Sequence, residues 1–166
     1  MQRIDDILGI RTKVGPGDLG EVIRLHGVEY ARECGFDLSF EAYVAGSIGE
    51  AFRRFDETRD RIWLAESKGR IIGVIGIVGL PDEAAQLRWY LVAREARGLG
   101  LGRRLLEEAL AFCRSTGRRR VILWTVRSLQ AAARLYRSAG FRLVEEIPRH
   151  QWGTEVVEQR YELNLD

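Results

Sequence analysis

The sequence has few cysteines, few histidines and no long hydrophobic run, and each shortage excludes a class of protein. Two cysteines are too few for the disulfide framework of a small secreted domain, and no Cys/His spacing fits a zinc site. The longest apolar run, residues 71–80, is about half a membrane span and contains three glycines. Residues 1–6 carry two acids and lack the apolar segment of a secretory signal. We therefore expect a cytoplasmic protein with no metal and no contact with a membrane.

Excess charge of one sign is also absent. Lys and Arg number 26 and Asp and Glu 24, and the net charge of +2 argues against a partner such as nucleic acid. The tract Arg118–Arg120 would suit a nucleic-acid patch in isolation. Its place between a helix end and a buried strand instead favours a structural role, because cations complement the helix dipole there. The length of 166 residues and the apolar content of 46% predict one globular domain over residues 1–166.

Hydrophobic periodicity predicts the element order β-α-α-β-β-β-α-β-α-β-β, a mixed α/β sheet with helices on both faces. Asp18 is expected to cap the first helix and Gly140 to end the last one. The fourth and fifth strands should be parallel, because a helix connects them. Strands are expected near residues 10–14, 61–66, 70–78, 86–92, 121–126, 141–147 and 155–163, and helices near 19–34, 40–55, from 101 onward and 130–139.

A glycine-rich turn, Arg97–Arg104, joins the fourth expected strand to the third expected helix. Its three glycines allow close approach of the backbone to a ligand, and the unpaired N–H groups and dipole of the helix favour an anion. With three added arginines the turn suits a diphosphate; the alternative is a tight turn that simply required glycine. A P-loop would need Lys-Ser or Lys-Thr after the last glycine, and a dinucleotide site would need G-x-G-x-x-G, so both fit poorly.

Two motifs in this order resemble the GNAT superfamily of acetyl-CoA-dependent N-acetyltransferases. Residues 97–102, RGLGLG, match the family's [Q/R]-x-x-G-x-[G/A] acyl-CoA loop, and residues 132–141, AARLYRSAGF, are similar to its A-x-x-L-Y-x-x-x-G-F signature. The chain departs from the family at Leu129, where Asn is frequent, and Ser128 or Gln130 could substitute. A narrower resemblance, over residues 25–42, is to acetyltransferase domains that bacteria fuse to MarR-type regulators; this chain would be the transferase half alone.

The resemblance implies a GNAT-like fold that uses acetyl-CoA as co-substrate. In that fold a bulge splays the strand before the loop, and its freed backbone pairs with the pantetheine. A backbone N–H near Tyr90 or Leu91 would then polarise the thioester carbonyl. The coenzyme-binding residues that the resemblance implies are Leu91, Val92, Ala93, Arg97, Gly98, Leu99, Gly100, Leu101, Gly102 and Arg103.

The resemblance also implies that Tyr136 is the general acid. A phenol with a pKa of about 10 keeps its proton at neutral pH and can give it to the leaving thiolate; the alternative is a packed core tyrosine. The base is not identified by any motif. His26 is the leading candidate because its pKa range suits base catalysis, although its apolar helix face favours a hydrogen-bonded core histidine. Glu29, Tyr30 and Glu33 are weaker candidates on the acceptor side.

We therefore expect an enzyme that transfers an acetyl group to the primary amine of a small molecule. Two alternatives stay open: a non-catalytic acyl-CoA-binding sensor or partner module, and a protein or peptide acetyltransferase. Residues 150–154 mix aromatic and polar groups, and could line the acceptor pocket or form an ordinary hairpin or homodimer contact. If His26 is a core residue, the acceptor site is expected around residues 36–40 and 150–154.

Overall fold

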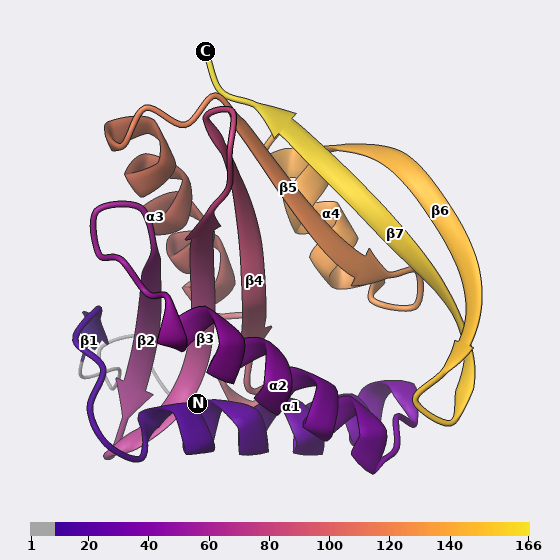
Figure 1. Ribbon diagram of the computed structural model, residues 1–166. Helices are drawn as coiled ribbons and strands as arrows, with labels where there is room; N and C mark the ends of the chain where they lie inside the picture. The colour runs from indigo at the N-terminus through magenta and orange to yellow at the C-terminus, as the bar shows by residue number, and fades with distance from the viewer. Residues whose placement is uncertain (1–8) are drawn as a thin grey trace.

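The computed structural model describes residues 9–166, and these form a seven-stranded mixed sheet with helices on both faces (Figure 1). Residues 1–6, which the sequence predicts not to form a signal segment, lie outside the described range. The predicted order of elements and the α/β class are confirmed. The elements are β1 (Gly9–Arg11), α1 (Asp18–Cys34), α2 (Leu38–Arg53), β2 (Arg61–Ser67), β3 (Arg70–Gly79), β4 (Ala84–Val92), the 3-10 turn η2 (Arg94–Ala96), α3 (Leu101–Ser115), β5 (Arg120–Val126), α4 (Gln130–Ser138), β6 (Arg142–Gln151) and β7 (Thr154–Asn164).

The strands lie in the order β1-β2-β3-β4-β5-β7-β6, and only the β4–β5 pair is parallel. The helix α3 connects these two strands, as the sequence predicts. In Figure 1, α1 and α2 cross one face of the sheet and α3 and α4 cover the other. None of the helices within residues 9–166 is both long and apolar enough to cross a membrane.

The parallel pair β4–β5 opens partway along its length. Pairing covers only residues 84–87 of β4 and 120–123 of β5, and beyond this point the two strands diverge (Figure 1). A register shift between Val74 and Gly76 of β3 marks a bulge in β4, where Trp89 has a φ of +51°. Gly76 permits the bulge, because a Cβ atom there would lie 2.4 Å from the Trp89 ring. The far half of β4 therefore pairs with β3 alone and presents its other edge to the opening.

The apolar face of each helix is buried against the sheet, in two clusters. The stripe of α3, which includes Leu105, Leu106 and Cys113, packs on one face with α4. Val22 of α1 and Ile48 of α2 pack on the other. Burial of one such Leu or Ile side chain stabilises the fold by about 1.5–3 kcal/mol. The core assignment predicted for Cys113 is therefore confirmed.

Three local predictions need correction at helix and strand ends. The N-cap of α1 is Gly17, with a φ of +92°, because the Asp18 carboxylate is already bound to Arg11 at 2.8 Å and to the Gly15 N–H at 2.6 Å. These contacts end β1 at Arg11 rather than at residue 14. α2 begins at residue 38 instead of 40, because Asp37 caps it by accepting the N–H of Ser39 at 2.9 Å.

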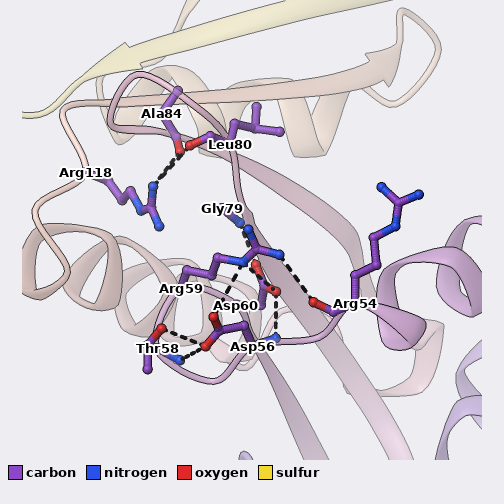
Figure 2. A network of polar contacts seen from close by, with 9 residues as sticks. All are labelled: Arg54, Asp56, Thr58, Arg59, Asp60, Gly79, Leu80, Ala84 and Arg118. Atoms are coloured by element: carbon purple, nitrogen blue, oxygen red, sulfur yellow. Dashed lines mark hydrogen bonds and ion pairs between the residues drawn. The ribbon is translucent and has the colours of Figure 1, made fainter.

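Arg118, the first residue of the arginine tract, fastens the loop between α3 and β5 to the far end of the sheet (Figure 2). Its Nη1 donates to the carbonyls of Leu80 and Ala84 at 3.2 and 3.3 Å. In the same network the buried Asp60 accepts the Gly79 N–H at 2.8 Å. Gly79 has no room for a side chain, because a Cβ would lie 2.7 Å from Arg118 Nη2. These contacts agree with a structural role for the tract.

Candidate active site

One cavity, which we call the loop cavity, has a volume of about 460 Å³ and lies where β4 has parted from β5. The end of β4, the glycine turn and the start of α4 form its walls. Its lining residues are Tyr30, Glu33, Tyr90, Leu91, Val92, Ala96, Arg97, Gly98, Gly102, Ser128, Leu129, Gln130, Ala131, Ala132, Leu135 and Tyr136.

The residues predicted to bind the coenzyme fall into two groups. Five of them line the loop cavity: Leu91, Val92, Arg97, Gly98 and Gly102. Five do not: the side chains of Ala93 and Leu101 are buried in the core, Arg103 is exposed, and Leu99 and Gly100 lie in the turn. Residues 128–132, which lead into α4, complete the lining together with Leu135 and Tyr136. The sequence drew attention to Leu129 as the position of the missing Asn, to Ser128 and Gln130 as its substitutes, and to Tyr136.

The glycines of the turn serve two different purposes. Gly98 and Gly100 have φ values of +77° and +83°, which other residues adopt only with strain. Gly100 caps α3 without a side-chain bond, so the first N–H groups of α3 have no intrahelical partner. Gly102 is needed for packing, because a Cβ there would lie 2.6 Å from the Tyr90 hydroxyl. The turn therefore offers unpaired N–H donors beside the cavity, which suits an anion.

Arg97 is already bound to acids of α1. Its guanidinium pairs with Glu33 and lies 3.6 Å from Glu29 Oε2, and its Nε donates to the Val92 carbonyl at 2.9 Å. The Glu29 side chain is 4% exposed, and its Oε2 accepts no hydrogen bond within the described residues. Both acids thus contact the arginine of the turn, whereas the sequence assigned them to the acceptor side.

A second cavity, which we call the aromatic cavity, has a volume of about 440 Å³ and lies on the other side of Tyr90. Residues from α1, α2, β4, β5 and the β6–β7 hairpin form its walls. Its lining residues are His26, Tyr30, Phe36, Phe40, Tyr43, Val44, Ser47, Gln86, Leu87, Arg88, Trp89, Tyr90, Trp124, Thr125, Val126, Tyr136, Gln151, Trp152 and Glu158.

Two segments that are distant in sequence meet in the wall of the aromatic cavity. The ring centroid of Trp152, in the β6–β7 hairpin, lies 4.9 Å from that of Phe36 and 5.0 Å from that of Phe40. The Asp37 N–H donates to the Trp152 carbonyl at 3.0 Å and holds the hairpin against the α1–α2 turn. Residues 36–40 and 150–154 therefore meet at this cavity, although His150 itself is exposed and bonds to Glu155.

His26 is buried and also borders the aromatic cavity. It is 3% exposed, its Nδ1 lies 2.9 Å from the Val22 carbonyl, and its ring stacks on Tyr30 at 6.0 Å. Burial lowers the pKa of His26 to about 4, so the imidazole is neutral at neutral pH. Nδ1 then donates to the carbonyl, and Nε2 is the nitrogen that could accept a proton.

The two cavities meet at Tyr30, Tyr90 and Tyr136, which line both. The rings of Tyr90 and Tyr136 lie 5.9 Å apart. Tyr136 is 4% exposed, and burial raises its pKa well above 10, so its hydroxyl keeps the proton through neutral and alkaline pH. No residue in the described range hydrogen-bonds this hydroxyl. A phenolic proton is thus available at the junction of the cavities.

Sequence reasoning missed a polar group in the aromatic cavity. Arg88 of β4 donates from Nη2 to the Ser47 hydroxyl of α2 at 2.6 Å, and Trp89 Nε1 donates to the same oxygen at 3.0 Å. The partners lie 41 and 42 residues apart, so no local spacing could have signalled them. Within residues 9–166 no set of three or more His, Cys, Asp or Glu side chains is placed to hold a metal ion.

Comparison with known proteins agrees with this geometry. A family model described as "Acetyltransferase (GNAT) family" matches residues 26–141. An N-acetyltransferase of Schizosaccharomyces pombe is 31% identical over 120 residues, 70% of this chain and 72% of that protein. N-acetyltransferase family 8 member 3 of Rattus norvegicus is 36% identical over 89 residues, 51% of this chain but only 39% of the rat protein. An acetyltransferase structure from Salmonella typhimurium "with its cofactor Acetyl-CoA" has a TM-score of 0.74 at 18% identity, covering 95% of this chain and 94% of that one.

Proposed function

The chain belongs to the acetyltransferase (GNAT) family, and from that premise we propose that it transfers an acetyl group from acetyl-CoA to the primary amine of a small molecule. One observation carries the proposal: the loop cavity and the aromatic cavity share Tyr30, Tyr90 and Tyr136. A thioester whose diphosphate lies at the glycine turn would present its acyl group at these tyrosines. An amine in the aromatic cavity would meet it there.

The loop cavity fits the coenzyme through its backbone. The unpaired N–H groups at the start of α3 would bind the pyrophosphate, and the β5-facing edge of residues 91 and 92 would pair with the pantetheine as an added strand. Ala93 and Leu101 can contribute only backbone atoms, because their side chains are buried. Arg97 would bind phosphate after leaving its acids, and Arg103 would add charge from the exposed face of α3.

Tyr136 is proposed as the general acid. As the amine nitrogen bonds to the carbonyl carbon, a backbone N–H near Tyr90 or Leu91 stabilises the charge on the oxygen. The carbon–sulfur bond then breaks, and the departing thiolate takes the phenolic proton of Tyr136. The raised pKa of Tyr136 guarantees that this proton is present at neutral pH.

The proton that the amine loses has no strong acceptor. His26 stays the predicted base, and its Nε2 is the available nitrogen. With its pKa lowered to about 4, His26 binds a proton far more weakly than an alkylamine does. We therefore propose that the amine reacts from its neutral form and that water carries its proton away, with His26 acting as a brief relay.

A small acceptor is supported by the volume of the aromatic cavity, about 440 Å³, and by Trp152, whose ring packs against Phe40 in its wall. The homodimer contact expected from the same hairpin stays a prediction, as does cytoplasmic location. The narrower resemblance to the transferase domains of MarR-type regulators also stays a prediction, because none of the comparisons above carries it.

The proposed function is tested by coenzyme binding followed by turnover. Acetyl-CoA at a hundredfold excess over its dissociation constant should stabilise the fold by about 2.7 kcal/mol, measured as a shift of the unfolding midpoint. Release of the coenzyme thiol should then depend on an added primary amine. An unfolding midpoint that saturating acetyl-CoA leaves unmoved would refute the proposal. Binding without release for any amine in a broad panel would instead favour the sensor alternative.

A further inference from the structure

Arg88 brings an uncompensated positive charge to the wall of the aromatic cavity. The side chain is half-buried, and its guanidinium carbon lies 5.3 Å from the centroid of the Trp89 ring. Its hydrogen-bond partner is the neutral Ser47 hydroxyl, and no carboxylate in the described range lies within 4 Å of it. A half-buried guanidinium that is not paired with a carboxylate can still bind an anion.

Ser47 adds a second donor at the same place. Its oxygen accepts both the Arg88 Nη2–H and the Trp89 Nε1–H, so both lone pairs are used. The hydroxyl hydrogen is left to donate, and no described residue accepts it. Two hydrogen-bond donors, the Arg88 guanidinium and the Ser47 hydroxyl, therefore lie together beside the cavity. A group that accepts hydrogen bonds and donates none, such as a carboxylate, would pair with both.

The acid of the same cavity does not neutralise this charge. Glu158 is bound by Arg149 at 3.2 Å and by the Gln151 amide. Burial lowers the pKa of His26 to about 4 and raises the pKa values of Tyr30, Tyr90 and Tyr136, so these four lining residues are neutral at neutral pH. The cavity thus contains one unpaired cation, Arg88, and one acid, Glu158, whose charge is already paired with Arg149.

The same cavity also presents a group of aromatic rings. Phe36, Phe40, Tyr43 and Trp152 form one group, with centroids 4.9–6.3 Å apart where they touch, and Tyr43 remains 55% exposed at the solvent side. Rings in this arrangement favour a flat or bulky apolar group through burial of apolar surface and ring–ring contact. The lining therefore combines a positive charge, which suits an anionic group, with rings that suit an apolar group.

We propose that the acceptor is an amino acid with an aromatic or other large apolar side chain. Its carboxylate binds Arg88 and Ser47, its side chain lies among the rings, and its α-amine points to Tyr90 and Tyr136. Arg88 and Tyr90 are two residues apart on β4, at most about 7 Å along the strand. Arg88, Tyr90 and Tyr136 all line the aromatic cavity, so one small molecule in it can contact the guanidinium and the tyrosines together. The acetylation of the amine in this inference rests on the proposed function, whereas the binding of the carboxylate does not.

Four related probes separate the parts of the proposal. L-Phenylalanine has carboxylate, amine and ring; its amide and 2-phenylethylamine lack the carboxylate; 3-phenylpropionate lacks the amine. Thiol release from acetyl-CoA should show a kcat/KM for L-phenylalanine about tenfold or more above the values for its amide and for 2-phenylethylamine. In calorimetry with CoA-saturated protein, 3-phenylpropionate should bind without any turnover.

Substitutions assign the preference to its residues. Arg88→Gln should weaken 3-phenylpropionate binding about tenfold or more and abolish the preference for L-phenylalanine over 2-phenylethylamine. Ser47→Ala should weaken the same binding less, because it removes one neutral donor. Arg114→Gln removes an equal charge from the exposed end of α3 and should change neither quantity.

The outcomes distinguish this inference from the proposed function. Equal kcat/KM for L-phenylalanine and 2-phenylethylamine, or 3-phenylpropionate binding that survives Arg88→Gln, overturns the carboxylate site while acetyl transfer stands. Binding of 3-phenylpropionate that depends on Arg88, without transfer to any amine, keeps the carboxylate site and overturns the proposed function. If Arg88→Gln does not fold, the comparison of the four probes on the unaltered protein still decides.

Discussion

The two cavities on either side of Tyr90 are built in different ways. The loop cavity takes most of its wall from three short segments, at residues 90–92, 96–102 and 128–136, and offers backbone N–H groups. The aromatic cavity is assembled from side chains of α1, α2, β4, β5 and the β6–β7 hairpin. Binding of a diphosphate is therefore a property of local backbone shape, whereas selection of the acceptor is a property of tertiary contacts. A substitution should damage each cavity by a different route.

The largest expected effect on activity concerns Tyr136, which lines both cavities and therefore belongs to neither alone. Tyr136→Phe keeps the buried ring and removes only the hydroxyl. If Tyr136 protonates the thiolate, kcat should fall about 10²–10⁴-fold while acetyl-CoA binding is unchanged. Steady-state thiol release and a coenzyme-dependent thermal shift measure the two quantities separately.

Tyr161→Phe is the matched control for this loss. Tyr161 is fully buried, its ring lies 5.9 Å from that of Tyr136, and it lines neither cavity. Its hydroxyl donates to Gln159 at 3.4 Å. Removing it should reduce stability slightly and leave kcat intact. Equal kcat values for the Tyr136 variant and the unaltered protein, with chemistry shown to be rate-limiting, would assign Tyr136 to packing.

The next effect should be confined to the loop cavity. Gly100→Val places a β-branched residue at a φ of +83°, so the turn must change shape and its N–H groups must move. The stabilisation by acetyl-CoA, about 2.7 kcal/mol at a hundredfold excess over the dissociation constant, should largely disappear. Gly117→Val carries similar strain at a φ of +72° at the other end of α3 and should keep the full shift. Loss of the shift in both variants would mean that general destabilisation, not the turn, is responsible.

The difference between local backbone shape and tertiary contacts also explains which parts of the structure could be predicted from the sequence. The element order, the parallel β4–β5 pair and the position of the bulged strand are confirmed, because periodicity and two short motifs carry them locally. The ion pairs of Arg97 with Glu33 and Glu29 were not predicted. The i,i+4 spacing of these two acids shows that they share a face of α1, but it does not show which element packs against that face.

Prediction was weakest where partners are far apart in the chain. Arg88 and Ser47 lie 41 residues apart, and Trp152 reaches Phe36 across more than a hundred. Residues 36–40 and 150–154 could be named as an alternative acceptor region from composition. Their contact depends on the Asp37–Trp152 hydrogen bond and on how β6 and β7 fold back, which no local pattern encodes.

A smaller effect should appear in the aromatic cavity as a dependence of stability on pH. The pKa of His26 is about 4 in the fold and about 6.5 in an unfolded chain, so between these values the unfolded state binds more protons. The free energy of unfolding should therefore decrease as pH falls from about 6.5 to about 4, by at most about 1.4 kcal/mol per unit. His26→Gln should remove this part of the slope in urea unfolding measured across that range.

His150→Gln is the control for His26→Gln. Because His150 is exposed, its substitution should leave the dependence of stability on pH unchanged. The kinetic profile of His26→Gln adds a second readout. Displacement of the low-pH limb of kcat/KM, with coenzyme affinity intact, would support a base or relay role. An unmoved limb together with a flatter stability slope would limit His26 to packing. A stability slope equal to that of the unaltered protein would contradict the buried neutral state.

The smallest effect concerns the ion pairs that hold Arg97 in the loop cavity. Glu33 lies at the rim of that cavity and competes with the phosphates for the same guanidinium. Glu33→Gln leaves Glu29 as the remaining acid beside Arg97 and should tighten acetyl-CoA binding by about two- to fivefold, because exposed ion pairs are worth only about 0.2–1 kcal/mol. Glu95→Gln makes the same charge change on the exposed face of η2, where no ion pair to Arg97 is present, and calorimetry should show a smaller gain. If both variants tighten binding equally, net charge and not the Arg97 pair limits affinity. If Glu33→Gln weakens binding, the acid positions Arg97 for the phosphates, and side chains as well as backbone shape the loop cavity.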